Sequence, residues 1–241
     1  MGISNKSRKC RWSSVYCNCG GGKLIKAIIF DFDGVLVESV DVKTEAFAQM
    51  FKDKGQEIVS KVVEYHLAHG GVSRFEKFKY FYKNFLKEEL SEVKLKDLCD
   101  KFSDIVVNRV VSAPWVKGAK EFLENYKDKY DFFIASGTPE NEIREIVKQR
   151  QISSFFRAVY GSPETKDQIT ARILSNYKLN PIEVLFVGDA PSDLKAARTN
   201  GIRFIARVNS CGYNPFNDVD FPIIHDLEKL ADVISKLTLK G

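Results

Sequence analysis

Short apolar segments that alternate with helical patterns constrain the fold of this 241-residue chain more than any other feature. Residues 24–30 are almost wholly apolar and rich in isoleucine, which is typical of a central parallel strand covered by helices on both faces. Further along we expect strands at 131–135, 157–160, 184–187, 203–206 and 221–224, and helices at 117–129, 139–149, 166–177, 191–200 and 227–237. This order predicts an α/β fold with a Rossmann-like, doubly wound parallel sheet.

The segment between the first two strands has a different pattern. It reads as helices, with two apolar stripes at helical spacing that are typical of packing faces. The stripes are Val42, Ala46, Phe47, Met50 and Phe51, and then Phe75, Phe78, Tyr82 and Phe85. With 44% hydrophobic residues, the chain is long enough for an α/β core (24–40 and 114–241) and one inserted all-helical domain (41–113).

Two aspartates at the end of the first strand are the strongest chemical signal. Asp31 and Asp33 follow the strand directly, and Gly34 permits a tight turn after them. Groups at the carboxyl ends of strands in an open α/β sheet face the ligand crevice, and the period of two lets both carboxylates point there. One carboxylate can attack phosphorus while the other handles a proton. This predicts phosphoryl transfer, and an ordinary strand-to-turn exit is the alternative.

The same pair of aspartates indicates a metal site. Two acids this close repel each other, and a divalent cation placed between them and a substrate phosphate relieves that repulsion. We expect Mg²⁺, because it prefers hard oxygen ligands and takes few carboxylates alongside phosphate and water.

The second strand opens into Ser136-Gly137-Thr138-Pro139. We expect the Ser136 hydroxyl and the nearby backbone N–H groups to face a phosphate, as anion sites near a helix start do. Thr138 is expected to cap the following helix, with Pro139 in its first turn. A routine helix cap without a ligand is the alternative interpretation.

Two further strand ends carry charged groups. Lys166 begins a predicted helix, where a cation is mildly unfavourable against the helix dipole, and this suggests a reason for its presence. Asp189 follows the strand 184–187 at the place expected of a metal ligand, and Asp193 can hold Lys166 or the metal's water shell. The alternatives are a solvated lysine and an acid-rich first helical turn.

Together these blocks resemble the haloacid dehalogenase superfamily of phosphohydrolases. The matching pattern is Asp31-Phe32-Asp33-Gly34-Val35-Leu36, then Ser136, then Lys166, then Gly188-Asp189 with Asp193. The resemblance implies that Asp31 attacks phosphorus to form an aspartyl-phosphate, and that Asp33 protonates the leaving alcohol and then activates water. Dehalogenases and phosphonatases of this fold typically lack the second aspartate, so its presence favours phosphate monoesters.

The resemblance also assigns the supporting groups. It implies that Ser136, the Gly137 backbone and Lys166 hold the equatorial phosphate oxygens. The Mg²⁺ ligands that it implies are Asp31, the carbonyl of Asp33 and Asp189, with Asp193 behind them.

By the same resemblance, the helices 41–113 are a cap that closes over the crevice and selects the leaving group. Its candidate substrate-facing loop begins at His69 and ends at Arg74, because the paired glycines between them allow close approach and Arg74 can clamp a second anion or sugar hydroxyls. A solvated helix cap is the alternative for Arg74. The loop is similar to that of the β-phosphoglucomutase branch, which has a histidine ten residues after its acid/base aspartate. Lys43 stands there in this chain. We expect it to contact the substrate, but it cannot supply a neutral imidazole's hydrogen bonds near pH 7 unless strongly desolvated.

The sequence therefore predicts a Mg²⁺-dependent phosphatase of a small phosphorylated metabolite, such as a sugar phosphate or a phosphoglycolate-like compound. A phosphosugar mutase and a catalytically silent binding module are the alternatives. The position of Lys43 places the mutase below the hydrolase, and the intact set of Asp31, Asp33, Lys166 and Asp189 argues against a silent module. The sequence leaves the individual metabolite and the oligomeric state open.

The net charge of +5 comes from residues 1–23, which hold five basic residues and no acid. Without them, basic and acidic residues are equal at 32 each, so we predict neither a nucleic-acid partner nor a membrane partner. We expect residues 1–23 to form a flexible basic tail without an apolar run long enough for a signal peptide or a membrane helix.

Cysteine usage gives a further expectation. A zinc knot of Cys10, Cys17 and Cys19 is the alternative for the tail, although the usual paired spacing and a clear fourth ligand are missing. Cys99 and Cys211 are far apart in sequence and read as reduced thiols, which favours a cytoplasmic location.

Overall fold

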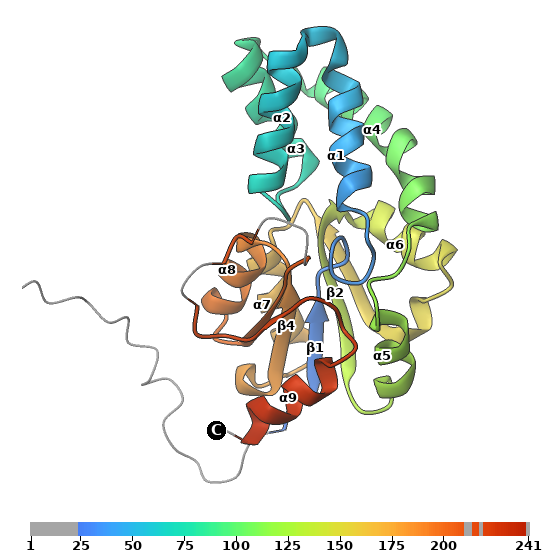
Figure 1. The fold of residues 1–241 in the computed structure, drawn as a ribbon, viewed down its shortest axis with the longest axis vertical. Coiled ribbons are helices and arrows are strands. Elements are labelled where there is room, and N and C mark those ends of the chain that lie inside the picture. The colour runs from blue at the N-terminus through green and yellow to red at the C-terminus, as the bar shows by residue number, and fades with distance from the viewer. Residues whose placement is uncertain (1–23, 210–213, 217–218, 240–241) are drawn as a thin grey trace, which may run out of the picture.

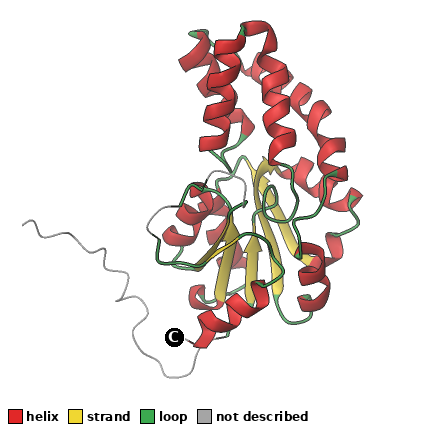
Figure 2. Cartoon of the chain, viewed as in Figure 1, coloured by secondary structure: helices red, strands yellow, loops and turns green. Residues whose placement is uncertain are grey.

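The computed structural model describes residues 24–209, 214–216 and 219–239, and its centre is a parallel sheet with helices on both faces (Figure 1; Figure 2). The six strands lie in the order β3-β2-β1-β4-β5-β6. Their bounds are β1 Ala27–Phe30, β2 Asp131–Pro139, β3 Phe156–Ser162, β4 Val184–Gly188, β5 Arg203–Arg207 and β6 Ile223–Ile224. The predicted fold class, a doubly wound parallel sheet with inserted helices, is confirmed.

The side chains of the central strands alternate between two buried faces, which explains why these strands are apolar throughout. In β1, Ile28 and Phe30 pack on one face while Ala27 and Ile29 pack on the other. The first face is covered by α5, α6 and α9, and the second by α7 and α8. Their bounds are α5 Ala119–Tyr126, α6 Glu140–Gln149, α7 Lys166–Asn176, α8 Pro191–Thr199 and α9 Leu230–Leu239.

A helical insertion, residues 40–112, stands above the carboxyl ends of the strands (Figure 1). It consists of α1 Val40–Phe51, α2 Gln56–Ala68, α3 Arg74–Tyr80 with a π-helical turn at Phe81–Leu86, and α4 Glu92–Ser112. The Phe47 ring lies at its centre, with ring centroids of Phe78, Phe81 and Phe102 at 5.5, 5.6 and 4.4 Å. This aromatic cluster belongs to the same core as the first face of the sheet, so the insertion is packed onto the sheet layer.

Several predicted boundaries differ from the structure, among them those of the first two strands. The first strand begins at Ala27 and not at residue 24. The second strand continues to Pro139, which pairs with Ser162 of β3, so Thr138 lies inside a strand and is not the cap of a helix. Helix α6 begins one residue later than expected, at Glu140, and the Thr138 hydroxyl bonds other side chains.

Residues 1–23, with the predicted basic tail and its three cysteines, lie outside the described residues, as does Cys211. Among the residues that are described, no helix combines the length and the apolar character that crossing a membrane requires.

Candidate active site

The sheet topology brings the separate sequence blocks together at one edge. Strand β1 lies between β2 and β4, so Asp31 at its end has residues after both neighbouring strands beside it. The Lys166 Nζ atom lies 2.7 Å from Asp31 Oδ2 and also pairs with Asp193. Asp189, after β4, forms an acidic cluster with Asp31 and Asp193. The predicted convergence of these loops is therefore observed in the structure.

Asp31 is buried at the base of the site, with only 3% of its surface exposed. Its Oδ1 accepts a 2.6 Å hydrogen bond from the backbone N–H of Phe32. Burial raises the pKa of Asp31 to about 7, with Lys166 opposing the rise and the negative charges of Asp193 and Asp33 adding to it. Its two oxygens are therefore held in place by one N–H donor and one cation.

Lys166 is held as a cation between two carboxylates. Burial alone would lower its pKa, but the charges of Asp193 and Asp31 outweigh burial and raise it. Asp193 is itself fixed, because its second oxygen accepts from the backbone N–H groups of Asp189 and Ala190 at 3.2 and 3.0 Å. The lysine consequently cannot swing away from Asp31 without leaving two buried charges unpaired.

The acidic cluster carries more negative charge than Lys166 neutralises. One oxygen of each of Asp31, Asp189 and Asp193 lies within 4.8 Å of the others. Burial raises the pKa of Asp189 well above its usual value, and the charges of Asp31 and Asp193 raise it further. These three carboxylates beside one lysine suit a divalent cation such as Mg²⁺, because they offer hard oxygen donors and are costly to ionise without one, so these residues fit the metal that the sequence implies.

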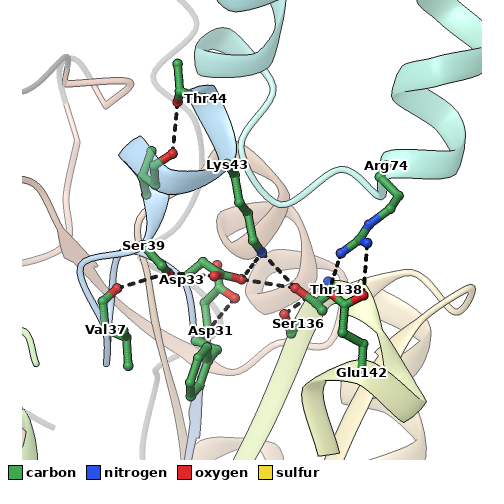
Figure 3. A network of polar contacts seen from close by, with 12 residues as sticks. Asp31, Asp33, Val37, Ser39, Lys43, Thr44, Arg74, Ser136, Thr138 and Glu142 are labelled. Atoms are coloured by element: carbon green, nitrogen blue, oxygen red, sulfur yellow. Dashed lines mark hydrogen bonds and ion pairs between the residues drawn. The ribbon is translucent and has the colours of Figure 1, made fainter. Parts of the chain in front are cut away.

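Asp33 has a different environment, shown in Figure 3. Its Oδ1 accepts from Ser39 Oγ at 2.6 Å, and its Oδ2 accepts from Lys43 Nζ and from Thr138 Oγ1 at 3.1 Å. Burial raises the pKa of Asp33, but Lys43 and the two hydroxyl groups outweigh this and lower it below the usual value. The two aspartates of the motif are thus tuned in opposite directions.

A cavity of about 250 Å³ lies between the sheet edge and the helical insertion. Of the predicted site residues it is lined by Asp31, Asp33, Lys43, Arg74, Gly137 and Asp189. Ser136 is fully buried and not among the lining residues, and its Oγ accepts from the backbone N–H of Thr138 at 3.1 Å. His69 is likewise not a lining residue: its ring stacks on Tyr65 with centroids 3.8 Å apart, beside a different hollow.

The glycine loop of the insertion touches the sheet edge directly. Gly71 has a φ of +72°, and a Cβ placed on it would lie 2.9 Å from Lys166 Nζ. A Cβ on Gly137 would lie 2.5 Å from the carbonyl oxygen of Gly71. Ser192 Oγ donates to the carbonyl of Gly70 at 3.1 Å. The close backbone approach that the paired glycines suggest is present, made here to the protein's own residues.

Arg74 is not solvated, contrary to the alternative considered for it. Only 5% of its surface is exposed, and its guanidinium forms a two-pronged ion pair with Glu142 of α6. It also donates to Ser103 Oγ of α4 at 2.7 Å and lies 4.5 Å from the Phe102 ring centroid. Arg74 therefore joins the insertion to the sheet layer while lining the cavity.

The sequence does not single out several polar residues that line the cavity. They include Thr138, which the sequence predicts as a helix cap, and His66, Lys77, Glu38 and Arg207. A signal existed for Lys77, because it stands three positions after Arg74 and therefore on the same side of α3. His66 offers a weaker one, four positions after the buried Val62 on α2.

Comparison with known proteins places this geometry in context. The family model described as haloacid dehalogenase-like hydrolase matches residues 28–207. A phosphoglycolate phosphatase of Pseudomonas savastanoi pv. phaseolicola is 26% identical over 87% of this chain and 79% of its own length. Another of Aliivibrio fischeri is 28% identical over 84% of this chain and 92% of its own. The crystal structure of β-phosphoglucomutase from Clostridium difficile has the same fold, with a TM-score of 0.73 and 18% identity over 90% of this chain and 98% of that one.

Proposed function

Because this chain belongs to the haloacid dehalogenase-like hydrolase family, we propose that it is a Mg²⁺-dependent phosphatase of small phosphate monoesters that works through an aspartyl-phosphate. The observation that carries the proposal is that Asp31 pairs with Lys166 and belongs to the acidic cluster, with Asp33 on the same cavity. A nucleophile, a fixed cation and a separate acid/base group are what phosphoryl transfer through a covalent intermediate requires.

In the first half of the reaction, a carboxylate oxygen of Asp31 attacks phosphorus and the bond from phosphorus to the alcohol oxygen breaks. Asp33 gives its proton to that oxygen. In the second half, Asp33 takes a proton from water, the water oxygen attacks phosphorus, and phosphate leaves Asp31 free. The ion pair with Lys43 favours the ionised Asp33 of the second half. We therefore expect Lys43 to turn toward the substrate when the first half begins.

The remaining groups hold the phosphate and the metal. Lys166 and the N–H groups around Gly137 would stabilise the equatorial oxygens, and Ser136 holds the turn by accepting from the Thr138 N–H. Asp31, the carbonyl of Asp33 and Asp189 would hold Mg²⁺, with Asp193 positioning Lys166 beside them. When bound, the cation would neutralise phosphate oxygens and relieve the repulsion among the carboxylates.

The substrate is a small metabolite, because a cavity of about 250 Å³ is below the range of roughly 300–1,000 Å³ typical of drug-sized ligands. We propose that residues 41–113 act as the cap that excludes water from it and contacts the leaving group. Lys43 and Arg74 are the predicted cap residues on this cavity, while His69 lies outside it and has no part in the proposal. A cytoplasmic setting completes the proposal, supported by the free thiol of Cys99.

A phosphate-release assay tests the proposal. Monoesters including 2-phosphoglycolate and several sugar phosphates are supplied with Mg²⁺, and we expect turnover that EDTA abolishes and excess Mg²⁺ restores. Asp31→Asn should lower kcat at least about 1,000-fold, because it removes the attacking oxyanion. Asp128→Asn, at an exposed position away from the cavity, is the matched control and should leave kcat unchanged. Full turnover by Asp31→Asn would contradict the assignment, and interconversion of phosphate positions without phosphate release would indicate a mutase.

A further inference from the structure

The wall of the cavity that belongs to the helical insertion carries a buried cation that the proposed reaction does not use. Lys77, on α3, has only 2% of its surface exposed and lines the cavity. Its Nζ atom lies 2.8 Å from Nδ1 of His66 on α2, a second buried residue of the same wall. The His66 carbonyl accepts a longer bond, at 3.4 Å, from the same Nζ.

Lys77 differs from the other cations of this cavity in its partners. Lys43 is paired with Asp33, Arg74 with Glu142, and Arg207 with Glu38. Among the described residues, no carboxylate lies within the 4.0 Å ion-pair distance of Lys77 Nζ. The neighbouring wall is apolar and aromatic, with the Phe47 ring centroid 5.9 Å from Nζ. A buried ammonium group without a counter-charge is unfavourable unless a ligand supplies one.

His66 adds a second unsatisfied donor. Since Lys77 Nζ carries only donors when it is charged, Nδ1 of His66 must be the acceptor of their bond, and the ring proton then lies on Nε2. Nε2 is buried and has no hydrogen-bond partner in the described part of the chain. Burial holds the pKa of His66 well below its usual value, and the charge of Lys77 lowers it further, so the ring is neutral.

We propose that Lys77, oriented by His66, binds an anionic group on the leaving-group portion of the substrate, so that the preferred substrates are phosphate monoesters carrying a carboxylate or a second phosphate. The inference rests on the proposed function and deepens it. Asp31 and Asp189, with the cation that they would hold, would bind the reacting phosphate at the sheet edge, and Lys77 would hold the second anion from the insertion side of the same cavity. Arg74 is less suited to this task, because its Nη1 and Nη2 atoms already donate to the two carboxylate oxygens of Glu142.

Matched pairs of substrates test this inference. We would compare kcat/KM for 2-phosphoglycolate with that for ethyl phosphate, which lacks the carboxylate, and for a sugar bisphosphate with that for its monophosphate. The wild type should prefer the member with the second anionic group in at least one pair, and that pair identifies the anion. Lys77→Met should reduce this preference roughly 10- to 100-fold, the effect of losing one hydrogen bond to a charged group. It should change kcat/KM for the member without the second anionic group less than about threefold.

Further variants separate charge from structure. Lys77→Arg keeps the charge and should retain part of the preference, and His66→Gln, which loses the orienting ring, should give an intermediate loss. Lys79→Met, on the exposed side of the same helix, is the control and should behave like the wild type. Calorimetric titration of Mg²⁺-loaded Asp31→Asn, with and without Lys77→Met, should show the same loss of affinity only for the compounds that carry the second anionic group.

The outcomes distinguish the two proposals. If Lys77→Met lowers kcat/KM equally for substrates with and without the second anionic group, or if the wild type shows no preference in either pair, the anion site is overturned and the phosphatase proposal stands. Absence of hydrolysis of every monoester overturns the proposed function, and the titration of Asp31→Asn then still decides whether Lys77 binds an anion.

Discussion

Replacing Lys77 by methionine should raise the free energy of unfolding, relative to that of the wild type, progressively as the pH falls from 9.5 to 7.5. The pKa of a lysine in an unfolded chain is about 10.4, whereas burial lowers the pKa of Lys77 in the folded protein to about 7. Because the folded state binds this proton less tightly than the unfolded state, the wild type loses stability as the pH drops through this window. Methionine has a similar length and no proton to bind, so the variant escapes the loss.

The size of the stability difference follows from the gap between the folded and unfolded pKa values of Lys77. Between the two pKa values the free energy of unfolding of the variant, minus that of the wild type, should rise by about 1.4 kcal/mol for each unit of falling pH. The full difference, reached below pH 7, is about 5 kcal/mol. The charged groups that act on Lys77 are Lys43, Lys166, Asp33 and Asp189, and they are present in both proteins.

Two further effects leave the slope intact. The variant also loses the bond to Nδ1 of His66, which costs about 1–3 kcal/mol and shifts the difference by an amount that does not depend on pH. His66 itself stays neutral throughout the window, because its pKa lies well below 6.5. The slope of the difference against pH, and not its absolute value, is therefore the quantity to measure.

Urea unfolding at half-unit steps of pH, in EDTA so that no metal alters the acidic cluster, supplies the measurement. Lys79→Met should give a difference that is flat with pH, because that side chain is exposed in the folded protein. A flat difference for Lys77→Met would show that Lys77 titrates normally in the folded protein and would refute the argument that it is buried without a counter-charge.

Two other substitutions test the buried ion pairs. Lys166→Met leaves the carboxylates of Asp31 and Asp193 buried without their cation, so we expect a loss of about 3–5 kcal/mol in the free energy of unfolding, measured in urea, together with loss of phosphate release. If stability fell by less than 1 kcal/mol, the pairing would not hold in solution. Arg74→Leu should lower the free energy of unfolding by a similar amount, because it leaves the buried Glu142 carboxylate unpaired. The double variant Arg74→Leu/Glu142→Leu should recover most of this loss. Additive effects in this double-mutant cycle would contradict a direct pair.

The fold was predictable because its signals are local. Apolar strand patterns, glycine turns and helix periodicity are each visible within a few residues, and their alternation admits few topologies. The errors lie where pairing partners decide the boundaries. Strand β2 runs on to Pro139 because Ser162 of β3 lies beside it, and no property of residues 136–139 alone indicates that partner. The general rule that parallel strands present their carboxyl ends at one edge was enough to gather Asp31, Lys166 and Asp189.

The insertion side of the cavity was less accessible to sequence reasoning. Arg74 was identified from its loop, but its partner Glu142 comes from a helix 68 residues away in the chain, and helix packing alone brings the two together. Lys77 and His66 occupy positions where a charged residue is usually solvated, and only the packing of α2 and α3 onto the aromatic cluster buries them. The residues proposed to contact the leaving group are thus brought to the cavity by tertiary contacts between helices, which the sequence pattern does not reveal.

The contact between Gly71 and Gly137 has a consequence for how such a chain can diversify. A side chain at Gly71 would be strained because its φ is +72°, and its Cβ would lie 2.1 Å from Ser192 Oγ, while a Cβ on Gly137 would lie 2.5 Å from the carbonyl oxygen of Gly71. Both the last part of β2 and the loop before α3 therefore require glycine while their backbones stay this close. New substrate preferences have to arise on the helix faces that look onto the cavity, where one side chain can be exchanged for another without disturbing the chemistry beneath.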